Sequence, residues 1–159
     1  MIFCRIMGTA VLFLSGILWA SHLNAILTRK KYQAAAIEEW LRFVRGQIDC
    51  FSMRISDIFI LSGTETLFAC GYLSDVMPRD FSEFLERAEI HDRDIKEALC
   101  ELCASFGGCY REEQLKACDR CIAVVSGRRQ TISSEMPKKK KLNATLCISA
   151  ALAVAILLV

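Results

Sequence analysis

Four cysteines form two pairs whose spacing is close to that of a metal site. The pairs are Cys100-x-x-Cys103 and Cys118-x-x-Cys121, and fourteen residues separate them. In four-cysteine zinc sites each pair sits on a tight turn, which lets the sulfurs converge about 2.3 Å from the ion. A zinc or thiol module built on these four side chains is therefore one hypothesis for this chain.

The elements that must carry these cysteines argue against zinc. Both pairs lie within helical patterns, and Gly107-Gly108 predicts a turn between them. If the hairpin turns near Gly108, the four cysteines lie about 7, 12, 15 and 20 Å along it at about 1.5 Å per residue. Cys103 and Cys121 are then about 12 Å apart along the hairpin. We therefore predict no metal and no cofactor. We expect Cys103 and Cys118 to be buried apolar side chains, and Cys109 to be an exposed thiol in the turn.

The remaining polar residues show no catalytic pattern. His91 lies beside Asp92 and Asp94, which we interpret as a polar helix entry and not as a general base. The chain has no phosphate-binding Gly-x-x-x-x-Gly-Lys loop and no nucleophile elbow. We predict that it is not an enzyme and has no small-molecule substrate.

Hydrophobic periodicity predicts helices throughout the middle of the chain. Apolar residues recur at the helical period over residues 34–48, and a last helix is predicted from about Tyr110 to Val125, before a polar stretch over Ser126–Pro137. Four helix starts lie between them, at Ser52, Thr64, Asp80 (a capping box with Glu83) and Asp92 or Asp94. The short helix from Ser52 is predicted to end at Ser62 and Gly63, and the short helix from Thr64 to run through Leu73. No strand pattern competes, so we expect an all-α bundle of five or six helices.

Both ends of the chain are strongly apolar. From Ile6 to Leu27 only His22 and Asn24 are strongly polar, and Leu142–Val159 carries no charge. Stretches of this kind cross a hydrocarbon core of about 30 Å, although the second is near the short limit. We predict an N-terminal transmembrane helix over residues 1–27, a helical domain over 28–137, and a basic flank with a C-terminal transmembrane helix over 138–159.

Basic residues next to the two predicted spans indicate their orientation. They are Arg29, Lys30, Lys31, Lys138, Lys139, Lys140 and Lys141, while Arg5 alone lies on the other side. Since such flanks stay on the cytoplasmic side, we expect a cytoplasmic domain whose lysines contact anionic lipid. A cleaved signal peptide is the competing interpretation, with Arg5 before the apolar run and small residues near Ala20. We favour a span because the run continues past Ala20 to a basic cluster.

The predicted domain is acidic. Between Tyr32 and Pro137 there are twelve basic and eighteen acidic residues. A nucleic-acid-binding domain would carry the opposite excess on its folded part. We therefore predict no nucleic-acid partner.

The order of these elements, together with one motif, resembles the stage III sporulation protein AB family. The motif is Phe106-Gly107 followed by Gln114 and Lys116, which is similar to that family's Leu-Gly, Gln and Lys pattern at the same spacing. The segment Asp49–Arg54 departs from the family pattern, because Cys, Phe and Arg stand where the family has Tyr, Gly and Pro.

The resemblance implies a non-enzymatic component of the channel complex built between mother cell and forespore during endospore formation. It implies a domain similar to those of type II secretion platform proteins, in the mother-cell membrane around the forespore. Its expected partners are membrane lipid, a secretion-type ATPase and other channel subunits, with Phe106, Gly107, Gln114 and Lys116 in that contact or in the fold beneath it. An unrelated scaffold with two spans remains an alternative.

Overall fold

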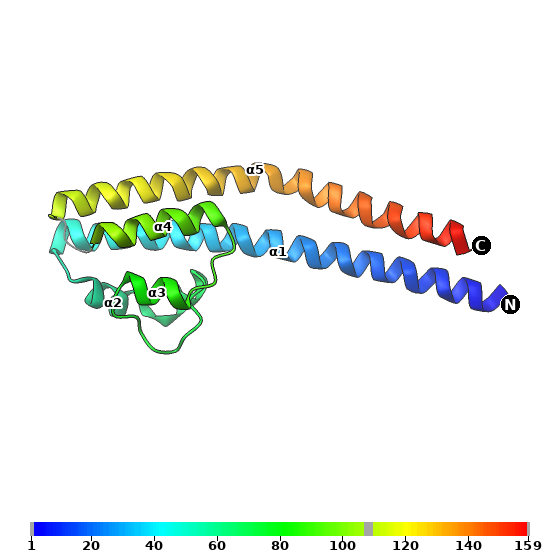
Figure 1. Ribbon diagram of the computed structural model, residues 1–159, viewed down its shortest axis with the longest axis horizontal. Helices are drawn as coiled ribbons and strands as arrows, with labels where there is room; N and C mark the ends of the chain where they lie inside the picture. The colour runs from blue at the N-terminus through cyan, green and yellow to red at the C-terminus, as the bar shows by residue number, and fades with distance from the viewer. Residues whose placement is uncertain (1, 107–109, 159) are drawn as a thin grey trace. The chain divides into compact units, whose positions relative to one another are not determined.

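The computed structural model describes residues 2–106 and 110–158, and the helices account for most of them (Figure 1). In chain order they are α1 (Ile2–Phe51), α2 (Ile55–Ala69), α3 (Phe81–Arg87), α4 (Arg93–Phe106) and α5 (Arg111–Leu158). In this part of the chain the only β pairing is an isolated bridge between Tyr72 and Ala88. The all-α prediction is confirmed. The chain divides into two compact units, one formed by Lys30–Ile132 and the other by Met1–Arg29 with Ser133–Val159.

The core of the Lys30–Ile132 unit is built on the predicted apolar stripe of α1. Every member of that stripe is buried: Ile37, Trp40, Leu41, Val44 and Ile48. The Trp40 ring lies 5.6, 5.5 and 4.9 Å from the rings of Phe59, Phe81 and Phe84, centre to centre. Each such side chain stabilises the fold by about 1.5–3 kcal/mol on burial, so this cluster joins α1 to α2 and α3.

The helical segment α2 is broken at Gly63, whose φ of 74° is open to glycine at little cost. The prediction of two short helices on either side of Gly63 is thereby confirmed. The predicted cap at Ser52 is wrong. Helix α1 continues past Gly46 to Phe51, and Ser52, with φ 50°, reverses the chain. Arg54 then precedes α2 without a side-chain cap.

Side-chain caps start the next two helices. Asp80 accepts a hydrogen bond from the Glu83 main-chain NH at 2.8 Å, and Glu83 Oε2 accepts one from the Arg79 NH at 2.9 Å. The predicted capping box is therefore present, with its return bond one residue earlier than usual. Of the two candidate starts of α4, Asp92 is the cap, since its Oδ1 accepts from the Ile95 NH at 3.4 Å.

The predicted end of the last helix near Val125 is wrong, because α5 runs through the polar stretch Ser126–Pro137 to Leu158. Pro137 lacks a main-chain NH and so removes one hydrogen bond from the helix. The residues around it, such as Glu135, Met136 and the following lysines, are good helix formers and favour continuation of the helix. Within the part of the chain that the structure describes, no helix combines the length and the apolarity that crossing a membrane requires. Both predicted spans include side chains that lie outside this part: those of residues 1–10, 12, 13, 151 and 155–159.

Candidate functional site

Ion pairs between α1 and α5 fix the start of α5, where the family-like motif continues. Arg111 donates to the Ile48 carbonyl at 3.2 Å, to the Asp49 carbonyl and to Asp49 Oδ1 at 3.0 Å. It thereby satisfies the Asp49 carbonyl at the end of α1 and adds a second donor to the Ile48 carbonyl, which also accepts from the Ser52 NH at 3.2 Å. Arg45 Nε lies 2.6 Å from Asp119 Oδ1, and this hydrogen bond is the main reason why the pKa of Arg45 is raised.

Two further contacts lie toward the other end of the same unit. Buried Glu38 on α1 has Arg42 Nη2 at 2.8 Å and Arg129 Nε at 3.1 Å, the second as an ion pair without hydrogen-bond alignment. Arg128 Nε on α5 lies 3.0 Å from Asp92 Oδ1 and 2.9 Å from Asp94 Oδ2. The first turns of α4 are therefore tied to the middle of α5.

The three motif residues that the structure describes lie in different surroundings. Phe106 stacks on Phe81 with ring centres 4.9 Å apart and is partly buried against the core. Gln114 is half-buried in the first turns of α5, while Lys116 is exposed. Gly107 lies outside the described residues. Lys116 lines a groove of about 510 Å³ whose other lining residues are Ser105, Glu113, Asp119 and Arg120. Of the three described residues, Lys116 is thus the best placed for an external contact.

The four cysteines do not form a coordination shell. Cys118 and Cys121 are buried, Cys103 is half-buried and Cys100 is exposed. Over the described residues, no group of three or more His, Cys, Asp or Glu side chains is placed to hold a metal ion. Burial raises the pKa of Cys118 to about 11 and that of Cys121 to about 12, which keeps both as neutral thiols. Cys109, the predicted exposed thiol, lies outside the described residues.

The other predicted polar positions have local partners. His91 Nδ1 lies 3.6 Å from Glu89 Oε1, and Asp92 is engaged by Arg128. Arg29, Lys30 and Lys31 lie within α1, and Lys138–Lys141 lie within α5, where Lys139 pairs with Glu135 at 2.7 Å. All seven basic positions are therefore helical.

The sequence profile of the stage III sporulation protein AB family matches residues 5–159, which is almost the whole chain. The chain belongs to this family. No curated protein and no solved structure shows a significant similarity to it. Membership in the stage III sporulation protein AB family makes the chain a sporulation protein and agrees with the resemblance drawn from the motif and the order of elements.

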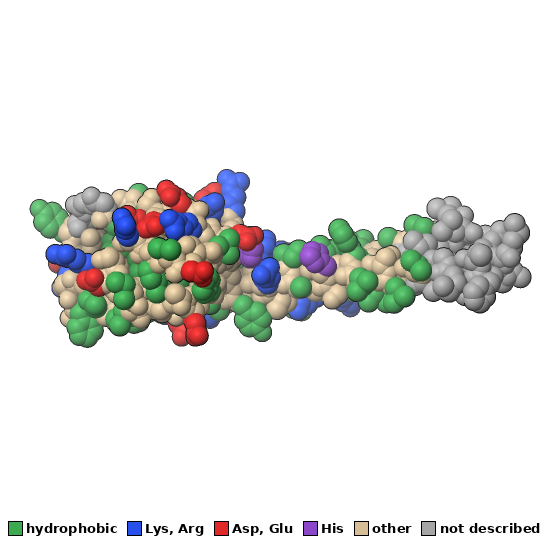
Figure 2. Space-filling model, turned by 90° about the horizontal axis from the view of Figure 1, so that it is seen from below, with side chains coloured by type: hydrophobic (Ala, Val, Ile, Leu, Met, Phe, Trp, Pro, Cys, Tyr) green, Lys and Arg blue, Asp and Glu red, His purple; other side chains and the backbone are tan. Residues whose placement is uncertain are grey.

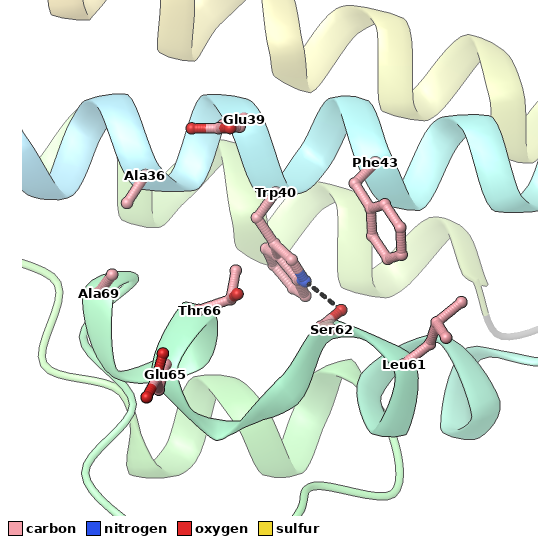
Figure 3. A pocket seen from close by; sticks show the side chains of 9 residues that line it. All are labelled: Ala36, Glu39, Trp40, Phe43, Leu61, Ser62, Glu65, Thr66 and Ala69. Atoms are coloured by element: carbon pink, nitrogen blue, oxygen red, sulfur yellow. Dashed lines mark hydrogen bonds between the residues drawn. The ribbon is translucent and has the colours of Figure 1, made fainter.

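For a sporulation protein with this fold, the surface of the helical unit is the candidate site. Figure 2 shows charged side chains of both signs spread over this unit, with apolar ones between them. Sequence reasoning missed one feature of that surface, a groove of about 470 Å³ between α1 and α2 (Figure 3). Its lining residues look like ordinary helix positions in the sequence, so only the packing of α2 on α1 reveals it.

Proposed function

We propose that this protein is a membrane-anchored docking subunit of the secretion-like channel between mother cell and forespore. Its Lys30–Ile132 unit faces the mother-cell cytoplasm and binds a secretion-type ATPase. The observation that carries the proposal is the family match over residues 5–159. The match favours a sporulation role over an unrelated scaffold with two spans, and the cysteine geometry gives the zinc alternative no support.

Exposed apolar side chains support the membrane anchor. They stand on the parts of α1 and α5 outside the Lys30–Ile132 unit. Those of α1 are Val11, Leu14, Ile17, Leu18, Trp19 and Ile26, and those of α5 are Leu142, Leu146, Ile148, Leu152 and Val154. Contact with water costs about 25 cal/mol for each Å² of such surface, and lipid removes that cost. The basic residues beside both segments favour a cytoplasmic location for the Lys30–Ile132 unit.

The construction of the helical unit supports a docking role. A single buried cluster around Trp40 joins α1, α2 and α3, and ion pairs join α5 to α1 and α4. Helix surfaces held in this way are preorganised, so binding a partner costs little conformational entropy. The excess of acidic residues on this unit suits a partner with a basic surface.

The membrane part of the proposal has a direct test in sporulating cells. We expect the chain to remain in the membrane fraction after alkaline carbonate extraction. A protease admitted to the mother-cell cytoplasm by permeabilising the outer cell membrane, with the membrane around the forespore left intact, should cut the helical unit. Extraction by carbonate, or protection of the unit under these conditions, would contradict the anchor or its orientation.

The motif residues allow a test of the ATPase contact. We expect Lys116→Glu combined with Gln114→Ala to lower the amount of ATPase that the full chain retains about tenfold, since a single charged contact contributes up to 1–3 kcal/mol. Lys96→Glu, at another exposed helical lysine on α4, is the matched control and should change little. Unchanged retention by the double variant would leave Gln114 and Lys116 with a role in the fold alone.

A further inference from the structure

The groove between α1 and α2 has an apolar floor. Its volume is about 470 Å³, and its lining residues are Ala36, Glu39, Trp40, Phe43, Leu61, Ser62, Glu65, Thr66 and Ala69. Figure 3 shows Phe43 and Leu61 at one end, and the small side chains of Ala36 and Ala69 at the other. Because the alanine side chains at that end are small, they leave room for a bulky side chain of a binding partner.

The break in α2 shapes this groove. Ser62 precedes Gly63, and its Oγ accepts a hydrogen bond from Trp40 Nε1 at 3.0 Å while donating to the Ile58 carbonyl at 2.7 Å. The indole is therefore fixed on the floor of the groove. Trp40 itself is only 1% exposed, so a ligand would rest against an anchored surface and would not need to reorganise the core.

Apolar side chains continue from the groove over the outer face of α2. Leu61 is 56% exposed and Phe68 is 45% exposed, and Ile60 beside them is 66% exposed. Ile60 and Leu61 stand on the helical segment before Gly63, and Phe68 stands on the segment after it. Three large apolar side chains exposed this close together in sequence mark an interaction surface more often than chance. This face therefore favours an apolar partner over solvent.

The charges around the groove are of one sign. Among the described side chains that line it, two are acidic, Glu39 and Glu65, and none is basic. Both glutamates are exposed, and neither has an ion pair within the described residues. Other carboxylates of α1 are compensated, since Glu38 pairs with Arg42 and Arg129, and Asp49 with Arg45 and Arg111. The negative charge at the groove is thus left for a cation from outside.

We propose that this groove binds a basic amphipathic helix of a partner protein. The apolar face of that helix lies over Trp40, Phe43 and Leu61 and inserts a bulky side chain at the alanine end. Its Lys or Arg residues pair with Glu39 and Glu65. This is the helix-in-groove mode of recognition, in which apolar anchors give affinity and charges set orientation. The proposal holds whether or not the partner is the ATPase.

A titration of the full chain tests the proposal. The chain is placed in nanodiscs of zwitterionic lipid and carries Trp19→Phe, so that Trp40 is the one remaining tryptophan. The probe is a helical peptide of leucine, alanine and lysine with its leucines on one face and no aromatic residue. We expect saturable binding with a shift of the Trp40 emission, and we expect no saturable binding of a peptide of the same composition in scrambled order. Empty nanodiscs measure binding to lipid.

Charge exchange separates this site from general attraction to an acidic domain. Glu39→Lys with Glu65→Lys should weaken binding at least about tenfold, and a probe with glutamate in place of lysine should bind this variant better than the wild type. Glu86→Lys with Glu112→Lys changes two exposed carboxylates elsewhere and should leave binding unchanged. If either reversal unfolds the chain, Glu39→Gln with Glu65→Gln gives a smaller loss of about threefold.

A substitution that fills the groove and a measurement of self-association complete the test. Ala69→Phe fills the alanine end and should also weaken binding, since Ala69 is exposed and its replacement spares the core. Absence of saturable binding by the wild type, or equal losses from both pairs of reversals, would overturn the proposal. If the wild-type chain forms a dimer that Glu39→Lys with Glu65→Lys dissociates, the occupant is a second copy and the proposed partner is wrong.

Discussion

Gln33 Nε2 donates hydrogen bonds to the Glu89 carbonyl at 2.7 Å and to the Cys70 carbonyl at 3.1 Å. The Oε1 atom of the same side chain accepts from the His91 NH at 3.0 Å. One buried side-chain amide on α1 thus bonds three main-chain groups. They belong to the connections that follow α2 and α3, both far from Gln33 in sequence. These connections also pair with each other, through the Glu89 NH and the Gly71 carbonyl at 2.8 Å.

Replacing Gln33 should lower the stability of the fold. Gln33→Leu keeps the volume but leaves two carbonyls and one NH without partners, at about 1–3 kcal/mol for the buried Cys70 carbonyl and less for the part-buried Glu89 carbonyl and His91 NH. We expect a loss of about 2–4 kcal/mol in the free energy of unfolding, measured by thermal or denaturant unfolding of the full chain. Gln130→Leu, at an exposed position of α5, is the control and should stay within about 0.5 kcal/mol. Equal stability of the two variants would contradict the role assigned to Gln33.

Gly71 should not tolerate a side chain. Its φ is +102°, and a Cβ there would lie 2.2 Å from Gln33 Nε2 and 2.6 Å from the Glu89 carbonyl oxygen. We expect Gly71→Ala to destabilise the chain by about 3 kcal/mol or more, through backbone strain and loss of the Gln33 bonds. Gly46→Ala is the opposite case: the position is helical and open, so we expect a gain of about 0.5–1 kcal/mol. Melting temperatures that move in the same direction for both substitutions would refute this explanation.

The contact between Asp92 and Arg128 should make stability depend on acid. Burial alone would raise the pKa of Asp92, but the hydrogen bond and charge of Arg128, with two main-chain donors, lower it overall. A lowered folded pKa means that the contribution is complete above the unfolded pKa of about 3.9 and is lost as pH falls through the folded value. We expect Asp92→Asn, which keeps a cap oxygen, to lose about 1–3 kcal/mol at neutral pH.

As pH falls from about 4 through the lowered folded pKa, that difference should shrink, because the wild-type carboxyl becomes protonated first in the unfolded chain and then in the folded one. Glu97→Gln removes the exposed pair with Arg93 and should cost about 0.5 kcal/mol or less. Unfolding curves at several pH values provide the measurement. A constant gap between wild type and Asp92→Asn down to the lowest pH would show that the Asp92 charge does not contribute.

Thiol labelling should follow burial. Cys50 and Cys100 are exposed, whereas burial raises the pKa of Cys70 to about 12 and that of Cys118 to about 11. Since the thiolate is the reactive form, we expect maleimide to label the first two in the folded chain and Cys70, Cys118 and Cys121 only after denaturation. Peptide mass spectrometry after timed labelling identifies the positions. Rapid labelling of Cys118 or Cys121 in the folded chain would contradict their burial.

A chelator should leave the fold unchanged. We expect the reduced, purified chain to carry no stoichiometric zinc, and its helical circular dichroism and melting temperature to be the same with and without EDTA. Structural zinc contributes folding free energy directly, so its removal would unfold the domain. About one zinc per chain together with collapse on chelation would revive the four-cysteine site.

The features that could be predicted from the sequence are those that arise locally. The period of apolar residues was enough to assign Trp40 and its stripe to the core, and a side chain three residues from its partner was enough to find the Asp80 cap. The break at Gly63 was predicted for the same reason, since glycine marks such breaks by itself.

Long-range packing explains what the sequence could not predict. The partners of Gln33 lie 37 to 58 residues away, so nothing near Gln33 indicates them. Pro137 and Gly127 look like helix breakers locally, yet α5 continues through both. The groove at Ala36 and Ala69 depends on how α2 crosses α1, a relationship that no local pattern carries. Membership in the sporulation family, in contrast, could be inferred from the motif that ends at Lys116 and from the order of elements.

Binding of the companion secretion-type ATPase to the full chain in nanodiscs tests the central claim most directly. The measurement is an equilibrium titration of purified ATPase onto nanodiscs that contain the wild-type chain, with empty nanodiscs as control. The proposed function predicts saturable binding at micromolar or tighter affinity, about 8 kcal/mol or more, that disappears when residues 32–132 are deleted. Absence of binding to the intact chain, or binding that persists after this deletion, would contradict it.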